Sequence, residues 1–347
     1  MQKSPYSWQP ARNSSFTGLV VRESIFRTDD RIRLKDSWDH LAARLGINRM
    51  GHTVVPGLYK LGKPGPFSPV LVTANYTLSF DALRSSLKGF DAYILVLETY
   101  GINVWCAAGK GTFGSEELIR KIEETNLSGI VKHRNLILPQ LGAPGVSSFK
   151  VKERTGFNVK YGPVRAVDIP DYLNQKKLSA EARRVTFPLV DRLVLIPVEF
   201  RQVALPMLVL ATILYFTVGL VPALALAGAA IAGSVLFPIF LPWLPTKDFS
   251  SKGFILGGLA ALVFAGVHFS GNAERDWIFL LASTLAYITA LPAITAFLSL
   301  NFTGASTFTS RTGVKKEIKR YFPVMVWMFA AGVLFFIASI ISSVTLI

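Results

Sequence analysis

The chain of 347 residues is long enough for two domains, carries a formal net charge of +15 and contains a single cysteine. One cysteine excludes an internal disulfide, an all-cysteine zinc site and an iron–sulfur cluster built by this chain alone. The basic excess is compatible with nucleic acid, but beside a strongly apolar half it fits the positive-inside bias and anionic lipid better, so we expect no nucleic-acid partner.

The charges are divided unevenly along the chain. Residues 1–202 hold 29 of the 37 Lys and Arg, whereas the remainder is nearly continuous apolar sequence. The first 25 residues lack an apolar h-region, which predicts no cleavable signal peptide. We predict a flexible N-terminal arm (1–30), a cytoplasmic α/β domain (31–186), an interfacial linker helix (187–202) and an all-α transmembrane domain (203–347).

Short apolar runs alternate with amphipathic segments in the N-terminal half. The predicted helices cover residues 33–45, 79–87 (capped by Ser79 and Asp81), 115–124 and 147–154, and a loop is expected at 57–69. The predicted strands cover residues 70–73, 93–97, 135–138, 158–161 and 165–167. This alternation indicates βαβ units on a mostly parallel, Rossmann-like sheet.

Ligands bind such sheets at the loops beyond the carboxyl ends of the strands. Three predicted loops fall there, at residues 73–77, 103–111 and 140–145. We therefore expect these loops to form the walls of one site.

The C-terminal half predicts five membrane spans, at about residues 203–221, 222–244, 253–270, 277–299 and 323–346. Pro222 is the expected break between the first two, and without it the count would be four. Basic residues gather between spans two and three (Lys247, Lys252) and between spans four and five (residues 311–320). With five spans both loops share a side with the basic N-terminal domain, which predicts a multi-pass protein of the cell membrane with that domain in the cytoplasm.

The spans contain few ionisable residues. His268 is expected to be an interfacial residue rather than a proton carrier, and the absence of a charge series disfavours a pump or transporter. Membrane lipid is therefore a predicted partner. A binding or transport protein, whose spans move a small ligand and whose soluble domain only senses it, stays open as an alternative.

The most distinctive stretch is the glycine-rich segment 101–114, which holds Cys106 and lies between a predicted strand and a predicted helix. A buried cysteine is usually an inert small hydrophobe. The start of a helix and the nearby Lys110, however, favour an anionic side chain. A phosphate-binding P-loop is excluded because Val104 and Gly111 stand where that motif requires Gly and Ser or Thr.

Two chemical roles for Cys106 remain. A nucleophile would need a histidine base, and the candidates His40, His52 and His133 lie in no recognisable signature. A soft thiolate ligand to the metal of a cofactor is the other role, since the neighbouring glycines and alanines leave room for a large flat ligand.

The octapeptide Asn103-Val104-Trp105-Cys106-Ala107-Ala108-Gly109-Lys110 resembles the cap-helix signature of the mercury-methylating corrinoid proteins. These are membrane-bound relatives of the large subunit of the corrinoid iron–sulfur protein of acetyl-CoA synthesis. The stretches 69–76 and 138–145 agree as well, and so does an α/β domain followed by five spans. The resemblance extends from about residue 30 onward.

The resemblance implies that Cys106 is the lower axial ligand of a corrinoid cobalt, in place of the usual imidazole or water. The residues it implies as corrin contacts are Thr73, Asn75, Asn103, Val104, Trp105, Cys106, Ala107, Ala108, Gly109, Lys110, Gln140, Leu141, Gly142 and Ala143.

The implied activity is that of a corrinoid-dependent methyltransferase, in which a methyl group passes from methyl-Co(III) corrinoid to Hg(II) and gives methylmercury. A thiolate opposite the methyl group supplies electron density, as it does to haem iron. The alternative is a membrane-tethered methyl carrier of a one-carbon pathway of the acetyl-CoA or folate type. With no intrinsic iron–sulfur cluster expected, a ferredoxin-like 4Fe-4S electron donor is implied, together with a methyl donor linked to methyltetrahydrofolate.

Overall fold

The computed structural model describes residues 25–306 and 309–345, which fall into two compact units. The α/β unit comprises Thr53–Leu178 and the described residues up to Arg31, and the helical unit comprises Ile32–His52 and the described residues from Ser179 onward. The segment Ile32–His52 therefore groups with the apolar helices, whereas the sequence analysis placed it in the α/β domain.

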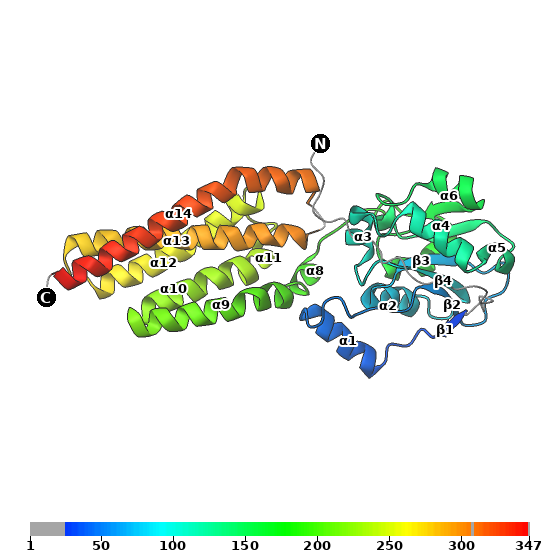
Figure 1. The fold of residues 1–347 in the computed structure, drawn as a ribbon, viewed down its shortest axis with the longest axis horizontal. Coiled ribbons are helices and arrows are strands. Elements are labelled where there is room, and N and C mark those ends of the chain that lie inside the picture. Colours follow the sequence, from blue (N-terminus) through cyan, green and yellow to red (C-terminus); the bar gives the residue numbers. More distant parts are fainter. Residues whose placement is uncertain (1–24, 307–308, 346–347) are drawn as a thin grey trace, which may run out of the picture. The chain divides into compact units, whose positions relative to one another are not determined.

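The α/β unit is built on one mixed sheet of six strands, most of them parallel, in the order β1-β2-β4-β3-β5-β6 (Figure 1). The strands are β1 (Phe26–Thr28), β2 (Gly57–Leu61), β3 (Val70–Ala74), β4 (Ala92–Leu97), β5 (Asn135–Leu138) and β6 (Asn158–Tyr161). Strands β3 to β6 run parallel, and β2 pairs antiparallel with β4. The mostly parallel sheet agrees with the prediction.

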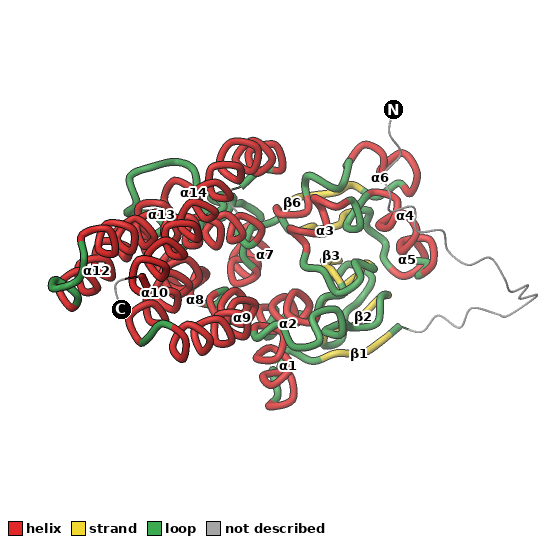
Figure 2. The backbone as a smooth tube through the Cα atoms, turned by 60° about the vertical axis from the view of Figure 1, so that its left-hand side comes forward, coloured by secondary structure: helices red, strands yellow, loops and turns green. Residues whose placement is uncertain are grey.

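Helices cover both faces of this sheet (Figure 2). They are α2 (Thr77–Ser86), α3 (Val104–Lys110), α4 (Ser115–Glu124), α5 (Leu127–Ile130), α6 (Ser148–Thr155) and α7 (Ile169–Gln175). Alternate residues of β4 point to opposite faces: Leu95 packs in a core with α3 to α6, and Ile94 in a core with α2 and α7. The near-continuous apolar runs in the sequence reflect this burial on both faces.

Several predicted elements differ from the structure. The loop expected at 57–69 begins with β2, because Gly57–Leu61 pairs along its whole length with β4. The strand expected at 165–167 is wrong, since Ala166–Asp168 is a 3-10 turn. Helix α2 starts at Thr77 after Tyr76, so Ser79 and Asp81 lie inside it and do not cap it.

The helical unit contains five helical segments that are long and apolar enough to cross a membrane: Leu189–Thr217, Leu220–Phe240, Phe249–Gly271, Trp277–Gly304 and Thr312–Ser343. Its helices are α1 (Leu34–Arg44), α8 (Leu189–Leu193), α9 (Ile196–Thr217), α10 (Leu220–Ile231), α11 (Phe237–Phe240), α12 (Phe249–Gly271), α13 (Trp277–Asn301) and α14 (Arg311–Thr345). A π-helical turn, Ala232–Leu236, joins α10 to α11.

The break between the first two apolar segments is at Gly219, not at Pro222 as predicted. Gly219 has φ +125°, a conformation that L side chains rarely adopt, and it separates α9 from α10. Pro222 lies in the first turn of α10, where the missing backbone N–H removes no helical hydrogen bond.

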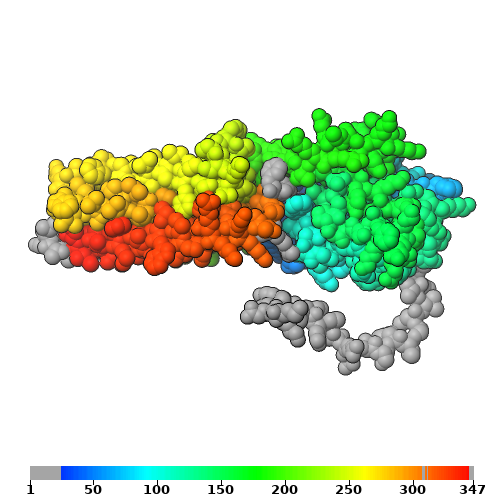
Figure 3. All heavy atoms as spheres, turned by 90° about the horizontal axis from the view of Figure 1, so that it is seen from above, coloured from blue at the N-terminus to red at the C-terminus, as the bar shows by residue number. Residues whose placement is uncertain are grey.

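Small residues bring α12, α13 and α14 close together (Figure 3). A Cβ built on Gly257 would lie 2.6 Å from Pro292 Cα, and one built on Gly332 would lie 2.7 Å from Ala290 Cβ. Such close approach is typical of helices packed within a membrane.

Candidate functional site

Cys106 lies in α3, a helix of seven residues, rather than in the turn expected from the glycine-rich sequence. The Asn103 side chain caps the helix by accepting a hydrogen bond of 2.9 Å from the Cys106 amide. Gly111 ends the helix with φ +88° and donates to the Ala107 and Ala108 carbonyls. Both ends of α3 are therefore defined by specific caps.

One side of α3 is packed in the core and the other faces outward. Val104, Ala107 and Ala108 are buried, whereas Trp105 and Cys106 are half-buried. Gly109 is exposed, and a Cβ built on it would meet nothing within 4 Å. Residues 105, 106 and 109 lie on one side of the helix, so the thiol is beside an open surface.

The loop at residues 140–145 packs directly against the backbone of α3 and of the residues that follow it. A Cβ on Gly145 would clash with the Phe113 carbonyl oxygen and lie 3.0 Å from Ala108 Cα, and a Cβ on Gly142 would lie 2.6 Å from the Phe113 ring. Only glycine permits this approach. Gly142 and Gly145 thus allow the predicted loop 140–145 to pack closely against the predicted loop 103–111 and Phe113.

Asn75 joins the remaining loop to the segment that leads into α3. Its side chain is 2% exposed, and its Oδ1 accepts hydrogen bonds from Thr99 N (3.1 Å), Thr99 Oγ1 (2.8 Å) and Gly101 N (3.2 Å). Its Nδ2 donates to Glu98 Oε1 at 2.7 Å. The Asn75 amide is thus engaged by the protein itself, so it orders the approach to α3 rather than offering a polar atom to a ligand.

The residues from Glu98 to Gly101 form a sharp turn. Tyr100 and Gly101 both have positive φ, of 56° and 69°, and the Tyr100 amide donates to Glu98 Oε1 at 2.8 Å. The sequence analysis missed Glu98 and Thr99. They follow β4 directly, as Asn75 follows β3, and this shared position at the ends of parallel strands was the available signal.

The structure separates the predicted contacts into two groups. The first group is buried and supports the site from the protein interior: Thr73, Asn75, Val104, Ala107, Ala108 and Gly142. The second group is exposed or half-buried: Asn103, Trp105, Cys106, Gly109, Lys110, Gln140, Leu141 and Ala143. Apart from Gly109, which has no side chain, the second group has side chains that are accessible to a ligand.

The outward side of α3 and the adjoining loop fit a large flat ligand rimmed by amides. The space above Gly109 is open, and Gln140 Oε1 is buried without a hydrogen-bond partner among the described residues. A buried acceptor of this kind is stabilised when a ligand donates a hydrogen bond to it. Amide side chains on the rim of a corrin ring are donors of this type, so these residues fit a corrinoid.

The described contacts support a nucleophilic role of Cys106 less well. His133 lies just before β5, at the opposite edge of the sheet from the loops that follow the strands, and its Nε2 is 2.8 Å from the Ser68 carbonyl oxygen. His133 Nδ1 accepts from the Asn135 amide at 3.2 Å. His40 and His52 belong to the helical unit. No described contact supplies Cys106 with a histidine base.

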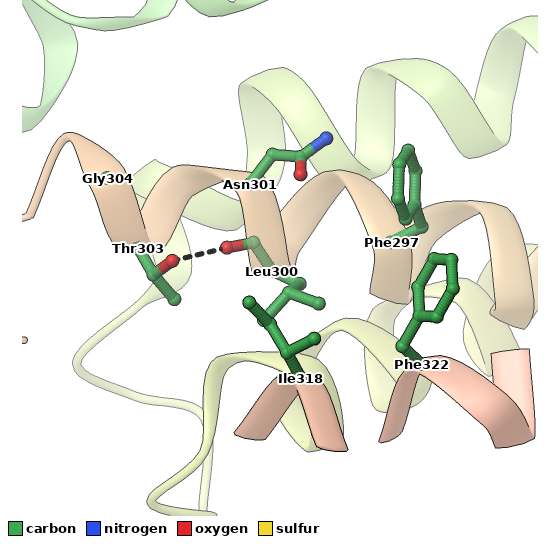
Figure 4. A pocket seen from close by; sticks show the side chains of 7 residues that line it. All are labelled: Phe297, Leu300, Asn301, Thr303, Gly304, Ile318 and Phe322. Carbon is green, nitrogen blue, oxygen red and sulfur yellow. Dashed lines mark hydrogen bonds between the residues drawn. The ribbon is translucent and has the colours of Figure 1, made fainter. Parts of the chain in front are cut away.

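A cavity of about 330 Å³ lies in the helical unit (Figure 4). Its lining comes from α13, α14 and the turn between them: Phe297, Leu300, Asn301, Thr303, Gly304, Ile318 and Phe322. None of these side chains titrates near neutral pH or is a nucleophile, so the cavity offers no acid–base or covalent chemistry.

Comparisons with known proteins concern the α/β unit. Residues 47–173 match the family of the CO dehydrogenase/acetyl-CoA synthase delta subunit. The acetyl-CoA decarbonylase/synthase complex subunit gamma of Methanopyrus kandleri is 35% identical over 127 residues, which are 36% of this chain and 27% of that subunit. The corrinoid/iron-sulfur protein large subunit of Moorella thermoacetica is 30% identical over 114 residues, 32% of this chain and 25% of that protein.

The chain thus spans little more than a quarter of the length of these relatives, and the family match ends before α8. The α/β unit is a relative of a corrinoid protein and of acetyl-CoA complex subunits, as the octapeptide resemblance predicted. The names of the relatives favour the one-carbon alternative over mercury methylation, which stays a prediction.

Proposed function

We propose that this chain is a membrane-anchored corrinoid protein that carries and transfers a methyl group, with Cys106 as the lower axial ligand of the cobalt. The observation that carries the proposal is the outward position of Cys106 on a capped, core-anchored helix, in a unit related to a corrinoid protein. A bound corrinoid supplies a cobalt that holds a methyl group, and an anionic sulfur ligand adds electron density to it.

The protein's own residues position the sulfur. Val104, Ala107 and Ala108 anchor α3 in the core, and Asn103 holds the Cys106 amide, so the backbone at Cys106 moves only with the helix. Gly109 keeps the neighbouring surface free of side-chain atoms. Because α3 is already ordered, binding of the cofactor does not incur the entropy cost of ordering the helix that carries Cys106.

The favoured acceptor is a component of a one-carbon pathway, because the relatives are named as parts of acetyl-CoA complexes. A ferredoxin-like 4Fe-4S protein as electron donor and a methyltetrahydrofolate-linked methyl donor belong to this proposal. The helical unit would hold the chain in the cell membrane, with the α/β unit in the cytoplasm.

Hg(II) is the second candidate acceptor. The octapeptide 103–110 resembles the mercury-methylating family along its whole length, and the membrane-capable helices lie outside the match to the acetyl-CoA relatives. Hg(II) would be the substrate, since a soft cation is suited to accept the methyl group, and the product would be methylmercury.

The test is the absorption spectrum of the full-length protein after loading with corrinoid, for wild type, Cys106→Ala and Cys106→His. We expect wild type to bind corrinoid with a sulfur-dependent spectrum, Cys106→Ala to lose that signature and Cys106→His to keep corrinoid with an altered one. Methyl transfer should fall in Cys106→Ala by more than the roughly 10–100-fold typical of losing an outer-shell partner.

Assays with Hg(II) and with a one-carbon acceptor, each with the ferredoxin-like partner, distinguish the two acceptors. Wild-type rates in both variants would remove the axial role of Cys106. Protein that stays colourless in excess corrinoid would instead favour a membrane protein that only senses a ligand.

A further inference from the structure

The outward side of α1 is apolar. Leu34, Trp38 and Leu41 are 83%, 69% and 46% exposed, whereas Asp36, Asp39 and His40 on the other side are partly covered. A surface helix of a soluble domain normally has the reverse arrangement, with its apolar stripe toward the core. The exposed face of α1 therefore calls for an apolar environment outside the helical unit.

Cations surround this apolar face, and the acidic groups of the segment are engaged within it. The apolar surface continues at Ile47 and Met50, which are also exposed. Asp36 accepts a hydrogen bond of 2.9 Å from the Arg33 amide, and Asp39 pairs with His52 at 2.8 Å. The basic residues of the segment are Arg33, Lys35, Arg44 and Arg49. Apolar side chains flanked by cations are complementary to an anionic lipid surface.

The end of α1 is joined to the first turns of α9. Arg201 Nη1 donates to the Leu45 carbonyl oxygen at 3.1 Å, and a Cβ on Gly46 would lie 2.9 Å from Val198 Cγ2. Helix α9 has 22 residues, or about 33 Å of helix, which is close to the ~30 Å thickness of a bilayer core. If α9 crosses a bilayer, its first turns, and with them the end of α1, lie at one surface.

We propose that α1 is an interfacial helix that inserts Leu34, Trp38 and Leu41 into the acyl boundary of an anionic leaflet, with its cations at the headgroups. This inference rests on the membrane location proposed above for the helical unit. It gives the segment Ile32–His52 a role distinct from the site at Cys106.

The test uses the full chain in lipid nanodiscs, with Cys106→Ala removing the only native cysteine so that one introduced cysteine carries a fluorescent label. Ser37→Cys places the label beside the apolar side chains without replacing them. Phe149→Cys on α6 is the matched aqueous control, and Leu334→Cys on α14 is the matched deep-lipid control, since both residues are exposed. Quenching is compared for shallow doxyl lipid, deep doxyl lipid and aqueous iodide.

We expect shallow lipid to quench the label at 37, iodide to quench the label at 149, and deep lipid to quench the label at 334. In the double variant Leu34→Gln and Trp38→Gln, we expect the label at 37 to be quenched by iodide instead of by shallow lipid. In discs containing phosphatidylglycerol, Lys35→Gln with Arg44→Gln should reduce shallow quenching to the level of phosphatidylcholine discs.

Iodide quenching at 37 equal to that at 149 would overturn the proposal. Shielding of the label at 37 from both lipid quenchers and from iodide would overturn it as well, because it would indicate packing against protein. In both cases deep-lipid quenching at 334 would leave the membrane location intact. Absence of lipid quenching at 334 would instead reject the membrane location itself, and the interfacial role of α1 with it.

Discussion

At the scale of single residues, Asn75 links the end of one strand to the segment that leads into α3. Its amide accepts three hydrogen bonds and donates one, and every partner lies in the segment Glu98–Gly101 that leads into α3. That segment contains two consecutive residues with positive φ, a conformation that the surrounding structure has to hold in place. The segment that leads into α3, the helix of Cys106, is therefore tied to a side chain that follows a different strand, β3.

Asn75→Ala should loosen the start of α3. Each buried group left without a partner costs about 1–3 kcal/mol, so we expect the unfolding free energy of the α/β unit to fall by at least about 2 kcal/mol and the Thr99 and Gly101 amides to exchange hydrogen faster. Asn158→Ala is the matched control, since its side chain bonds only the Arg134 carbonyl oxygen among the contacts described, at the other edge of the sheet.

Asn75→Asp combined with Glu98→Gln exchanges donor and acceptor while keeping both shapes. We expect this pair to restore part of the protection at Thr99 and Gly101 that Asn75→Asp alone removes, because the new amide at position 98 would be the donor and the new carboxylate at position 75 the acceptor. The Tyr100 amide, which donates to Glu98 Oε1 in the wild type, should stay less protected. Exchange at Thr99 and Gly101 unchanged in Asn75→Ala would contradict the role assigned to this amide.

At the scale of elements, α1 is held to its own loop by one histidine. His52 is 5% exposed, with Nδ1 2.8 Å from Asp39 Oδ1 and Nε2 2.7 Å from the Ile47 carbonyl oxygen. Burial lowers the pKa of His52, but the Ile47 carbonyl and the Asp39 carboxylate outweigh it, so that the pKa lies above its ordinary value of 6.5. The doubly protonated ring is the form that can donate to both acceptors.

Because the folded pKa of His52 is raised, its contribution to stability is complete below about pH 6.5 and is lost as pH rises through the folded pKa. We therefore expect amide exchange in α1 to accelerate, relative to intrinsic exchange, as the pH rises above about 6.5. His52→Gln should be pH-independent over this range, because its amide does not titrate. Exchange in wild type that follows only the intrinsic rate would show that the pair does not hold the helix.

At the scale of the whole molecule, the basic loops determine the expected orientation. Lys247 lies between the second and third apolar segments, and Lys252 lies in the first turn of the third. Residues 311–320 lie at the start of α14, where the fifth segment begins, while Arg275 stands between Glu274 and Asp276 in the loop between the third and fourth. Five crossings place both strongly basic loops on one side of the membrane.

Single cysteines introduced in the Cys106→Ala background should report this orientation. With a membrane-impermeant maleimide, we expect Arg275→Cys to be labelled in intact cells, and Lys247→Cys and Lys315→Cys only after permeabilisation. Labelling of Lys315→Cys in intact cells would reduce the number of crossings or reverse the orientation.

Local pattern was sufficient for much of the architecture. Helix 115–124 and strands 135–138 and 158–161 have the predicted bounds, because short apolar runs between polar and glycine-rich segments leave few alternatives. The apolar length of the C-terminal half likewise determined five membrane-capable segments. The prominence of Cys106 also came from sequence, since a lone cysteine between glycines is visible without coordinates.

Tertiary structure decided the rest, because it depends on partners far away in the chain. Gly57–Leu61 is a strand only because β4 pairs with it, and α1 turns its apolar side outward because its polar side meets His52. Asn75, a predicted ligand contact, hydrogen-bonds to residues 98–101, some 25 positions later. A hydrogen-bond network across two strands leaves no periodic trace in the sequence, so only the folded chain reveals what holds Cys106 in place.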